Sequence, residues 1–455
     1  MEKETLITNG TLITWEKPNQ ILEGQALLIS NGRIAGIGQQ AELTARYSQA
    51  EILDAAGQYI MPGNICAHTH FYGAFARGMA IPGLAPKDFP EILRKLWWPL
   101  DRALTLEDVR ASAEVMLVDA IRHGTTTLID HHASPNAIEG SLDVIAEAVE
   151  RSGLRAALCY EVTDRDGPQK AQAGIAENLR FIQKAFQKRS PGAKISATFG
   201  LHASLTLSDG TLEACRQVVP QGVGFHIHAA EHESDQYDSL AKSGLRVIDR
   251  LHRHGILGPQ SIVAHAVHVD ARETAILAES GTRVTHQPRS NMNNGVGVAQ
   301  VESMLRAGVN LCLGTDGFPS TMWEEWKTTY LLQKAWNRDP QRMPADAIAE
   351  MAVYNNAALS GSFFPEAPLG LLQEGAHADL IFVDYRSHTP VTPENLPWHI
   401  VFGFHESMVT TTIVSGQLLM RDRKLLTMDE EAIAAHALQL APAVWKRYAE
   451  NVVSS

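Results

Sequence analysis

The sequence predicts an α/β fold in which a (β/α)8 barrel, a TIM barrel, is inserted into a small discontinuous β-sandwich domain. From residue 61 to 365, short apolar strands alternate with helical stretches of a dozen or more residues, which indicates parallel strand pairing. Eight strand-helix units over about 300 residues fit a closed barrel better than an open sheet. Antiparallel strand patterns occupy both flanks. We therefore expect 1–60 and 366–455 to form the β-sandwich, with a C-terminal helical tail, and 61–365 to form the barrel.

The N-terminal flank consists of short strands and turns. Asn31-Gly32 separates two apolar runs in ALLISNGRIAGIG, residues 26–38, and this dipeptide is typical of a β-hairpin turn. A strand pattern returns after the barrel in ADLIFVD (378–384) and MVTTTIVSGQLLM (408–420). A helical pattern covers residues 430–450. The two flanks are expected to share one small domain.

One barrel unit can be followed residue by residue. Thr105 with Asp108 matches a helix N-terminal cap, residues 109–123 have helical spacing, and Gly124 ends the helix before TTTLIDHH begins. The same rhythm recurs along the chain. The eight expected strands are NICAHTH (64–70), TTTLIDHH (125–132), RAALCYEV (155–162), ISATFGLHAS (195–204), GFHIHAAE (224–231), SIVAHAVHV (261–269), RVTHQP (283–288) and NLCLGTDG (310–317).

Composition excludes several classes of protein. No run approaches the roughly 20 apolar residues that a membrane span needs, so we expect no membrane association. The net charge of −12, without a cluster of Lys and Arg, argues against nucleic acid as a partner. The four cysteines form no C-x-x-C pair, and the N-terminus lacks the apolar core of an export signal. These features favour a cytoplasmic protein that acts on a small molecule.

Polar residues gather at the carboxyl ends of the expected strands, where barrel active sites form. His68 and His70 lie two positions apart, so both imidazoles face one side and could reach one ion, although two alternating core histidines would give the same spacing. Each unpaired buried imidazole is costly, and a shared cation removes much of that cost. The residues on this rim are His68, His70, His131, His132, His202, His228, His265, His268 and Asp316.

Two further stretches extend the metal hypothesis. In FHIHAAEHE the spacing cannot choose between His226 and His228, but His228 lies nearer the rim and is favoured as the ligand. Glu231 follows it and is placed to carry a proton, although a solvated loop acid is the usual fate of a glutamate. Asp316 ends a fully apolar strand, which suggests that it meets a cation. Imidazoles with one carboxylate and no thiolate suit Zn²⁺ first and Fe²⁺ as the alternative.

His-x-His on strand one, His-x-His-x-x-Glu on strand five, a histidine on strand six and an aspartate on strand eight resemble the amidohydrolase superfamily. Within it, the chain is similar to the cytosine-deaminase-like and chlorohydrolase branch, and IDHHASP and RSNMNN resemble an aminohydrolase subgroup of that branch. The resemblance implies metal ligands at His68, His70, His228 and Asp316, a proton shuttle at Glu231, and at His265 a histidine that orients the nucleophile. Asp316 is also implied as a catalytic proton acceptor. No lysine ends strand four, so one divalent metal ion is expected.

The resemblance also implies a small-molecule heterocyclic substrate. His202 matches a substrate-contacting histidine on strand four. Arg77 follows strand one, while Arg289 and Asn291 lie in the polar loop THQPRSNMNNGVG, residues 285–297, where this chain departs from the more usual HNPxSNxxL. We expect these four residues to contact the substrate. His132, His268 and His286 are interpreted as hydrogen-bonded histidines without an assigned role.

These expectations converge on a metal-dependent aminohydrolase in which hydroxide on the metal attacks a ring carbon and ammonia leaves. One alternative is displacement of chloride or an alkylamine from a triazine-like ring. A more distant one is a non-catalytic binding protein on the same barrel. The P-C-x-x-C motif of cytidine-type deaminases and the phosphate-binding P-loop are both absent from the sequence. Relatives in the family often form dimers, so the resemblance implies a homodimer.

Overall fold

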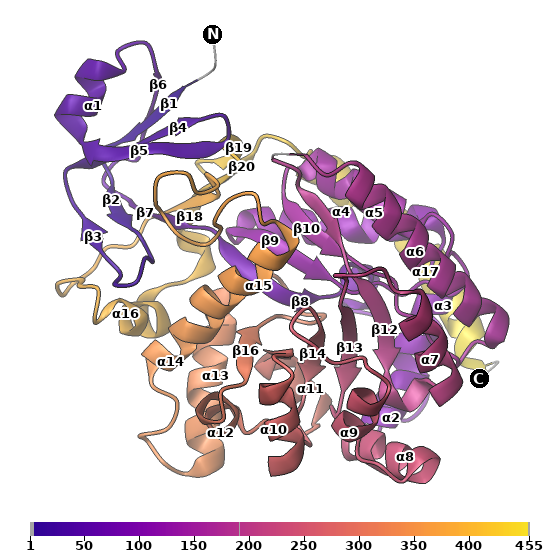
Figure 1. Cartoon of the computed structure of the whole chain (residues 1–455). Coiled ribbons are helices and arrows are strands. Elements are labelled where there is room, and N and C mark those ends of the chain that lie inside the picture. The colour runs from indigo at the N-terminus through magenta and orange to yellow at the C-terminus, as the bar shows by residue number, and fades with distance from the viewer. Residues whose placement is uncertain (1–3, 191, 454–455) are drawn as a thin grey trace.

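The computed structural model describes residues 4–190 and 192–453. The first three residues of the expected 1–60 segment and the last two of the 366–455 segment lie outside this range. Eight parallel strands form a barrel whose fourth strand is interrupted at Thr198 (Figure 1). In order around the barrel the strands are β8 (Asn64–Thr69), β9 (Thr125–Asp130), β10 (Arg155–Leu158), β11 (Ile195–Ala197) with β12 (Phe199–Ala203), β13 (Phe225–Ala229), β14 (Ile262–His265), β15 (Arg283–His286) and β16 (Asn310–Leu313).

The barrel closes between its first and last strands. The Thr315 amide donates to the His68 carbonyl at 3.0 Å, and the His70 amide donates to the Asp316 carbonyl at 3.3 Å. Gly314 makes this close approach feasible, since a Cβ there would lie 2.7 Å from the His68 amide nitrogen. The expected barrel is thus confirmed, and all eight sequence-derived strands contain a barrel strand.

Helices follow the strands and cover the outside of the barrel. Thr105 and Asp108 form the expected capping box at the start of α4. The helix itself packs against β9. The covering helices are α4 (Leu106–Arg122), α5 (Ser141–Ser152), α6 (Pro168–Gln187), α7 (Asp209–Val218), α8 (Glu233–Ser243), α9 (Val247–Arg253), α10 (Ala271–Glu279), α12 (Val301–Arg306), α13 (Met322–Asn337), α14 (Ala345–Ala349) and α15 (Asn356–Phe363). The short helix α11 (Pro288–Asn294) lies instead at the carboxyl-end rim, where Ser290 donates to Asp316.

An irregular segment separates β8 from α4. It contains the 3-10 helix η1 (Phe71–Ala76), α2 (Phe89–Ile92), the π-helix η2 (Leu93–Trp97) and α3 (Trp98–Ala103). The C-terminal helix α17 (Glu430–Val453) packs against α3 and α4, so the end of the chain lies beside this segment (Figure 1). Among the described residues, we find no helix with the length and apolarity required to span a bilayer.

Two further sheets make up the β-sandwich. Asn31 and Gly32 both adopt left-handed backbone conformations, with φ of 53° and 73°, and form the expected hairpin turn between β4 and β5. The four-stranded sheet has the order β5 (Arg33–Gln39), β4 (Gln25–Ser30), β1 (Thr5–Thr8) and β6 (Glu51–Asp54). The seven-stranded sheet has the order β20 (Lys424–Leu425), β19 (Gln417–Arg421), β18 (Val409–Val414), β17 (Leu380–Val383), β7 (Tyr59–Pro62), β2 (Thr11–Ile13) and β3 (Ile21–Leu22).

The pairing of β7 with β17 brings the two flanks of the barrel together in one sheet. A shared apolar core joins the two sheets, with Ile7 and Leu27 from one and Ile60 and Phe382 from the other. Burial of these apolar side chains stabilises the two-sheet domain through the hydrophobic effect. The exact limits, 1–60 and 366–455 around 61–365, stay a prediction. Within the C-terminal flank, α16 (Leu396–Gly403) connects β17 to β18, and α1 (Gln40–Arg46) follows β5.

Candidate active site

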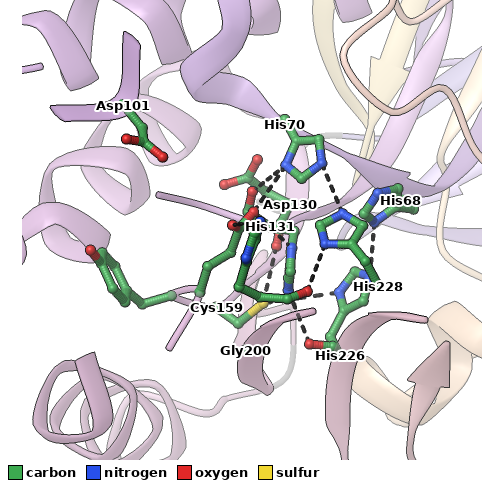
Figure 2. Close-up of polar contacts among 12 residues, drawn as sticks. His68, His70, Asp101, Asp130, His131, Cys159, Gly200, His226 and His228 are labelled. Atoms are coloured by element: carbon green, nitrogen blue, oxygen red, sulfur yellow. Dashed lines mark hydrogen bonds and ion pairs between the residues drawn. The ribbon is translucent and has the colours of Figure 1, made fainter. Parts of the chain in front are cut away.

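Four side chains from three barrel strands converge at the carboxyl-end rim. His228 Nε2 lies 3.2 Å from His70 Nε2, which lies 3.2 Å from the Oδ1 atom of Asp316. His68 Nε2 is buried without a hydrogen-bond partner. One ring nitrogen of His68, one of His70 and a carboxylate oxygen of Asp316 all lie within 4.8 Å of one another. Figure 2 shows the imidazoles of His68, His70 and His228 grouped around one point.

Backbone carbonyls orient two of these imidazoles. His70 Nδ1 lies 2.5 Å from the His131 carbonyl, and His228 Nδ1 lies 2.8 Å from the His202 carbonyl. Only a protonated Nδ1 can donate to a carbonyl, so each Nε2 is left with a lone pair that faces the common point. This is the arrangement that metal-binding histidines require.

The third imidazole, His68, is oriented by another histidine. Its Nδ1 lies 2.9 Å from His226 Nε2, and His226 Nδ1 lies 3.9 Å from the Sγ atom of Cys159. His226 is fully buried and is not among the residues that line the cavity described below. The structure therefore separates the two histidines of strand five, with His228 among the converging groups and His226 behind them.

Asp316 is held by its neighbours in a fixed orientation. Its backbone adopts a left-handed conformation with φ of 57°, its Oδ2 accepts a 2.6 Å hydrogen bond from Ser290 Oγ, and its Oδ1 accepts from the Gly317 amide. Burial alone would raise the pKa of Asp316, but the hydrogen bond and charge of His70 hold it well below its usual range. The aspartate is therefore an anion that needs a positive charge beside it.

The donor set fits a divalent ion. Three imidazole nitrogens and one carboxylate, with no thiolate among them, match the ligand preferences of Zn²⁺ and Fe²⁺. Burial lowers the pKa of His70, but the hydrogen bond and charge of Asp316 and the charge of Glu161 outweigh it and raise that pKa to about 9, so these two carboxylates favour a positive charge at this place. A cation at the common point would give the orphaned His68 Nε2 a partner.

Glu231 and His265 lie next to the four converging residues, and a ring nitrogen of His265 also lies within 4.8 Å of ring nitrogens of His68 and His228. His265 Nε2 is 3.4 Å from Glu231 Oε2 and 3.7 Å from Asp316 Oδ2. The Asn291 side-chain amide donates to His265 Nδ1 at 3.1 Å, which leaves the imidazole proton on Nε2, facing both carboxylates. Burial, followed by the charge of Asp316, raises the pKa of Glu231 well above its usual range, so this carboxyl group can carry a proton near neutral pH.

A cavity of about 380 Å³ opens above these groups. His70, His228, Glu231, His265 and Asp316 form its polar floor, and aromatic and aliphatic side chains form its walls. Such an apolar pocket with a few convergent polar groups is typical of a site for a flat, drug-sized molecule. The wall side chains include Tyr72, Phe89, Leu93, Trp97, Trp98, Met116 and Phe318.

The expected substrate residues divide into two pairs. His202 and Arg77 line the cavity. Arg289 does not: its guanidinium is bound to Glu325 at 2.6 Å and to Glu324 at 2.5 Å, on α13. This placement corrects the expectation of a substrate contact for Arg289, because the polar loop folds into α11 and directs that side chain toward α13. Asn291 is likewise fully buried against His265, outside the cavity lining.

Sequence reasoning missed a buried carboxylate. Glu161 Oε1 lies 3.0 Å from His131 Nδ1 and 3.5 Å from His70 Nδ1, and its Oε2 lies 3.7 Å from His202 Nε2. Although burial opposes ionisation, the nearby histidines hold the pKa of Glu161 well below its usual range. Glu161 follows the third barrel strand, so its position at the carboxyl end of a strand could have indicated it, as it indicated the other rim residues.

A second missed feature is an ion pair in the cavity wall. The Arg165 guanidinium contacts the carboxylate of Asp101, and it also lies 3.1 Å from Asp166. Both Asp101 and Arg165 line the cavity. Burial raises the pKa of Asp101 to about 7 in spite of this partner. Asp101 lies in a helical stretch and Arg165 in a loop, so no periodicity pointed to the pair.

The remaining histidines make local hydrogen bonds or none. His132 Nε2 lies 2.9 Å from Ser134 Oγ, and His268 Nε2 lies 2.6 Å from the Val296 carbonyl. His286 is buried, and neither ring nitrogen has a hydrogen-bond partner. His131, in contrast, connects Glu161 to the His226 carbonyl and thus belongs to the layer behind the cluster.

Comparison with known proteins gives consistent results. Residues 59–419 match the family described as Amidohydrolase family. The chain is 32% identical over 443 residues to a 5'-deoxyadenosine deaminase of Methanosarcina mazei, covering 96% of this chain and 98% of that protein. It is 31% identical over 445 residues to a 5-methylthioadenosine/S-adenosylhomocysteine deaminase of Syntrophobacter fumaroxidans, covering 96% and 98%.

Solved structures show the same architecture. A zinc-bound adenosine deaminase from Xanthomonas campestris superimposes with a TM-score of 0.84 at 26% identity, covering 100% of this chain and 99% of that one. An atrazine chlorohydrolase from Arthrobacter aurescens, complexed with zinc, superimposes with a TM-score of 0.82 at 21% identity, covering 96% and 100%. The second likeness concerns the fold alone.

Proposed function

Because the chain belongs to the amidohydrolase family, we propose that it is a metal-dependent deaminase that removes an amino group, as ammonia, from a nitrogen heterocycle. The observation that carries this proposal is the convergence of His68, His70, His228 and Asp316 on one point, with Glu231 and His265 beside them. A non-catalytic descendant of the same fold would be expected to have lost part of this set, and all of it is present.

The four converging residues would hold one divalent ion, and we propose Zn²⁺. Three imidazoles and a carboxylate suit this ion, and the similar adenosine deaminase structure contains it. When bound, such an ion would acidify a coordinated water and make it nucleophilic near neutral pH. Asp316 lines the cavity and would accept the proton that the attacking water gives up.

Glu231 and His265 would act on the substrate itself. With its raised pKa, Glu231 can give a proton to the ring nitrogen next to the attacked carbon, which makes that carbon more electrophilic. The proton that Asp316 takes from the attacking water would then pass to the departing amine, which leaves as ammonia. His265 directs its Nε2 proton toward the same place and would donate a hydrogen bond to the oxygen that forms on the carbon. An amino group must be protonated before it can leave as ammonia, whereas chloride leaves as an anion without a proton.

The relatives point to adenine nucleosides as the first substrates to test. Two similar proteins are named for deamination of 5'-deoxyadenosine and of 5-methylthioadenosine or S-adenosylhomocysteine. The aromatic walls formed by Tyr72, Trp97 and Phe318 suit a flat ring. His202 lines the same cavity beside His228 and could contact a nitrogen atom of such a ring. A homodimer stays a prediction from the family resemblance.

Ammonia release by zinc-loaded protein tests the proposal. The panel contains 5'-deoxyadenosine, 5'-methylthioadenosine, S-adenosylhomocysteine, adenosine, guanine, cytosine and atrazine, and chloride release is followed in parallel. We expect ammonia from at least one aminated ring, with no release from chelator-treated protein. Chloride release from atrazine without ammonia from any other compound would favour displacement on a triazine-like ring instead.

A further inference from the structure

One wall of the cavity has an irregular backbone. The segment from η1 to α3 supplies Trp97, Trp98 and Asp101 to the cavity lining, and part of it is the π-helix Leu93–Trp97. Pro99 lies two residues beyond this π-helix and has no N–H, so the Lys95 carbonyl lacks the donor that an α-helix would supply four residues later. Short irregular helices of this kind need partners for their carbonyl groups.

The C-terminal helix α17 supplies such partners. Tyr448 donates its hydroxyl to the Lys95 carbonyl at 2.6 Å, and the Asn451 amide donates to the Pro99 carbonyl at 3.0 Å. Further along the wall, Arg447 Nε donates to the Ala103 carbonyl at 2.6 Å, and Trp445 Nε1 to the Phe75 carbonyl at 2.9 Å. Tyr448 is buried in this contact, and α17 lies beside α3 (Figure 1).

These four bonds have a common geometry. Each joins a side chain of α17 to a backbone carbonyl close to a cavity-lining residue. Phe75 precedes Ala76 and Arg77, Lys95 and Pro99 flank Trp97 and Trp98, and Ala103 lies two residues after Asp101. No residue of α17 itself lines the cavity among the described residues. The helix can therefore affect a bound molecule only through the position of the wall.

We propose that α17 is a positioning element for substrate binding, with Tyr448, Asn451, Arg447 and Trp445 as its positioning residues. The proposal rests on the proposed function for the identity of the substrate. The wall that α17 holds is separate from the four converging residues, none of which hydrogen-bonds to α17 in the described chain. Loss of an α17 contact should therefore weaken substrate binding and leave metal binding and the chemical step intact.

The test compares Tyr448→Phe and Asn451→Ala with a matched control, Tyr354→Phe. Tyr354 also donates its hydroxyl to a backbone carbonyl, that of Glu16, far from the cavity. We expect KM to rise about three- to tenfold in the two α17 variants, with kcat within about twofold of wild type and full zinc content. An unchanged KM in both variants, or a loss of zinc or kcat at constant KM, would overturn the proposal.

Hydrogen exchange separates this proposal from the proposed function. If the wild-type protein releases no ammonia from any compound, the proposed function fails, and the positioning role is then judged on exchange alone. Amides of residues 93–104 should exchange faster in Tyr448→Phe than in Tyr354→Phe, while the barrel strands exchange equally in both. Equal exchange of residues 93–104 in the two variants would show that α17 does not hold the wall.

Discussion

His226 Nε2 lies 2.9 Å from His68 Nδ1, so a histidine of the fifth barrel strand fixes the orientation of one on the first. The sequence spacing made His226 and His228 equivalent, since residues two apart on a strand share a face. The structure gives them different depths. His228 reaches the rim, and His226 takes the layer beneath it, where Cys159 lies on its other side.

Substitution of His226 should weaken metal binding without removing a proposed ligand. In His226→Gln, His68 loses the contact that sets its tautomer and ring orientation, and partners of this kind typically contribute 10- to 100-fold, or about 1.4 to 3 kcal/mol, to affinity. Competition with a chromophoric chelator measures the zinc dissociation constant. His132→Gln, another buried rim histidine, serves as the control. Equal zinc affinity in the two variants would contradict the role of His226.

Removal of a proposed ligand should have a much larger effect. His228→Ala or Asp316→Asn should lower turnover by several orders of magnitude, because the nucleophile depends on the ion that these groups would hold. Metal analysis should show less than one zinc per chain. The matched controls, His388→Ala and Asp384→Asn, alter exposed residues and should retain metal and activity. Full turnover in His228→Ala would remove this cluster from the mechanism.

Glu231 should prove essential for deamination but not for metal binding. Glu231→Gln keeps the side-chain shape but cannot transfer a proton, so kcat for ammonia release should fall by about 10²- to 10⁴-fold with zinc content unchanged. The neighbouring exposed acid gives the control, Glu233→Gln, which should behave as wild type. A variant that deaminates at the normal rate would assign proton transfer to another group.

Asp235 should make the stability of the protein depend on pH. Burial raises its pKa from 3.8 to about 7, and its Oδ2 accepts a hydrogen bond from the Ala230 amide at 2.6 Å. Between those two values the folded chain holds the proton and the unfolded chain does not. The contribution of Asp235 to stability should therefore fall as pH rises from about 4 to 7, by up to about 1.4 kcal/mol per pH unit.

The variant Asp235→Asn keeps an acceptor for Ala230 and cannot ionise. Its melting temperature relative to wild type should rise between pH 5 and pH 8, as measured by scanning fluorimetry of the zinc-loaded proteins. Asp384→Asn, at an exposed position, should show the same difference at both pH values. A pH-independent difference for Asp235→Asn would mean that this group does not titrate in the window.

Much of the fold was readable because its signals are local. Each barrel strand is a short apolar run, the hairpin at Asn31-Gly32 needs two left-handed residues, and the capping box at Thr105 involves neighbours in sequence. The converging residues were predicted by a geometric rule, that carboxyl ends of parallel strands meet at one rim. His68 and Asp316 were brought together by that rule although they lie in the first and last strands.

What the sequence could not show depends on contacts between distant elements. Arg289 looked like a substrate contact because its loop is polar, and only the fold shows that α13 offers it two carboxylates. Asn291, from the same loop, meets His265 instead of the cavity. The Asp101–Arg165 pair and the bonds from α17 likewise join segments whose local patterns carry no signal of each other.

The place where the first and last barrel strands meet is also part of the proposed metal site. Asp316 exchanges backbone hydrogen bonds with the first strand and also presents its carboxylate to His70, so one residue both completes the ring of strands and faces the ion. A cation bound there would link β8 to the residue that follows β16, two segments that otherwise meet through hydrogen bonds. Removal of the ion by a chelator would therefore loosen the contact between β8 and β16, and the enzyme would lose rigidity and activity in the same event.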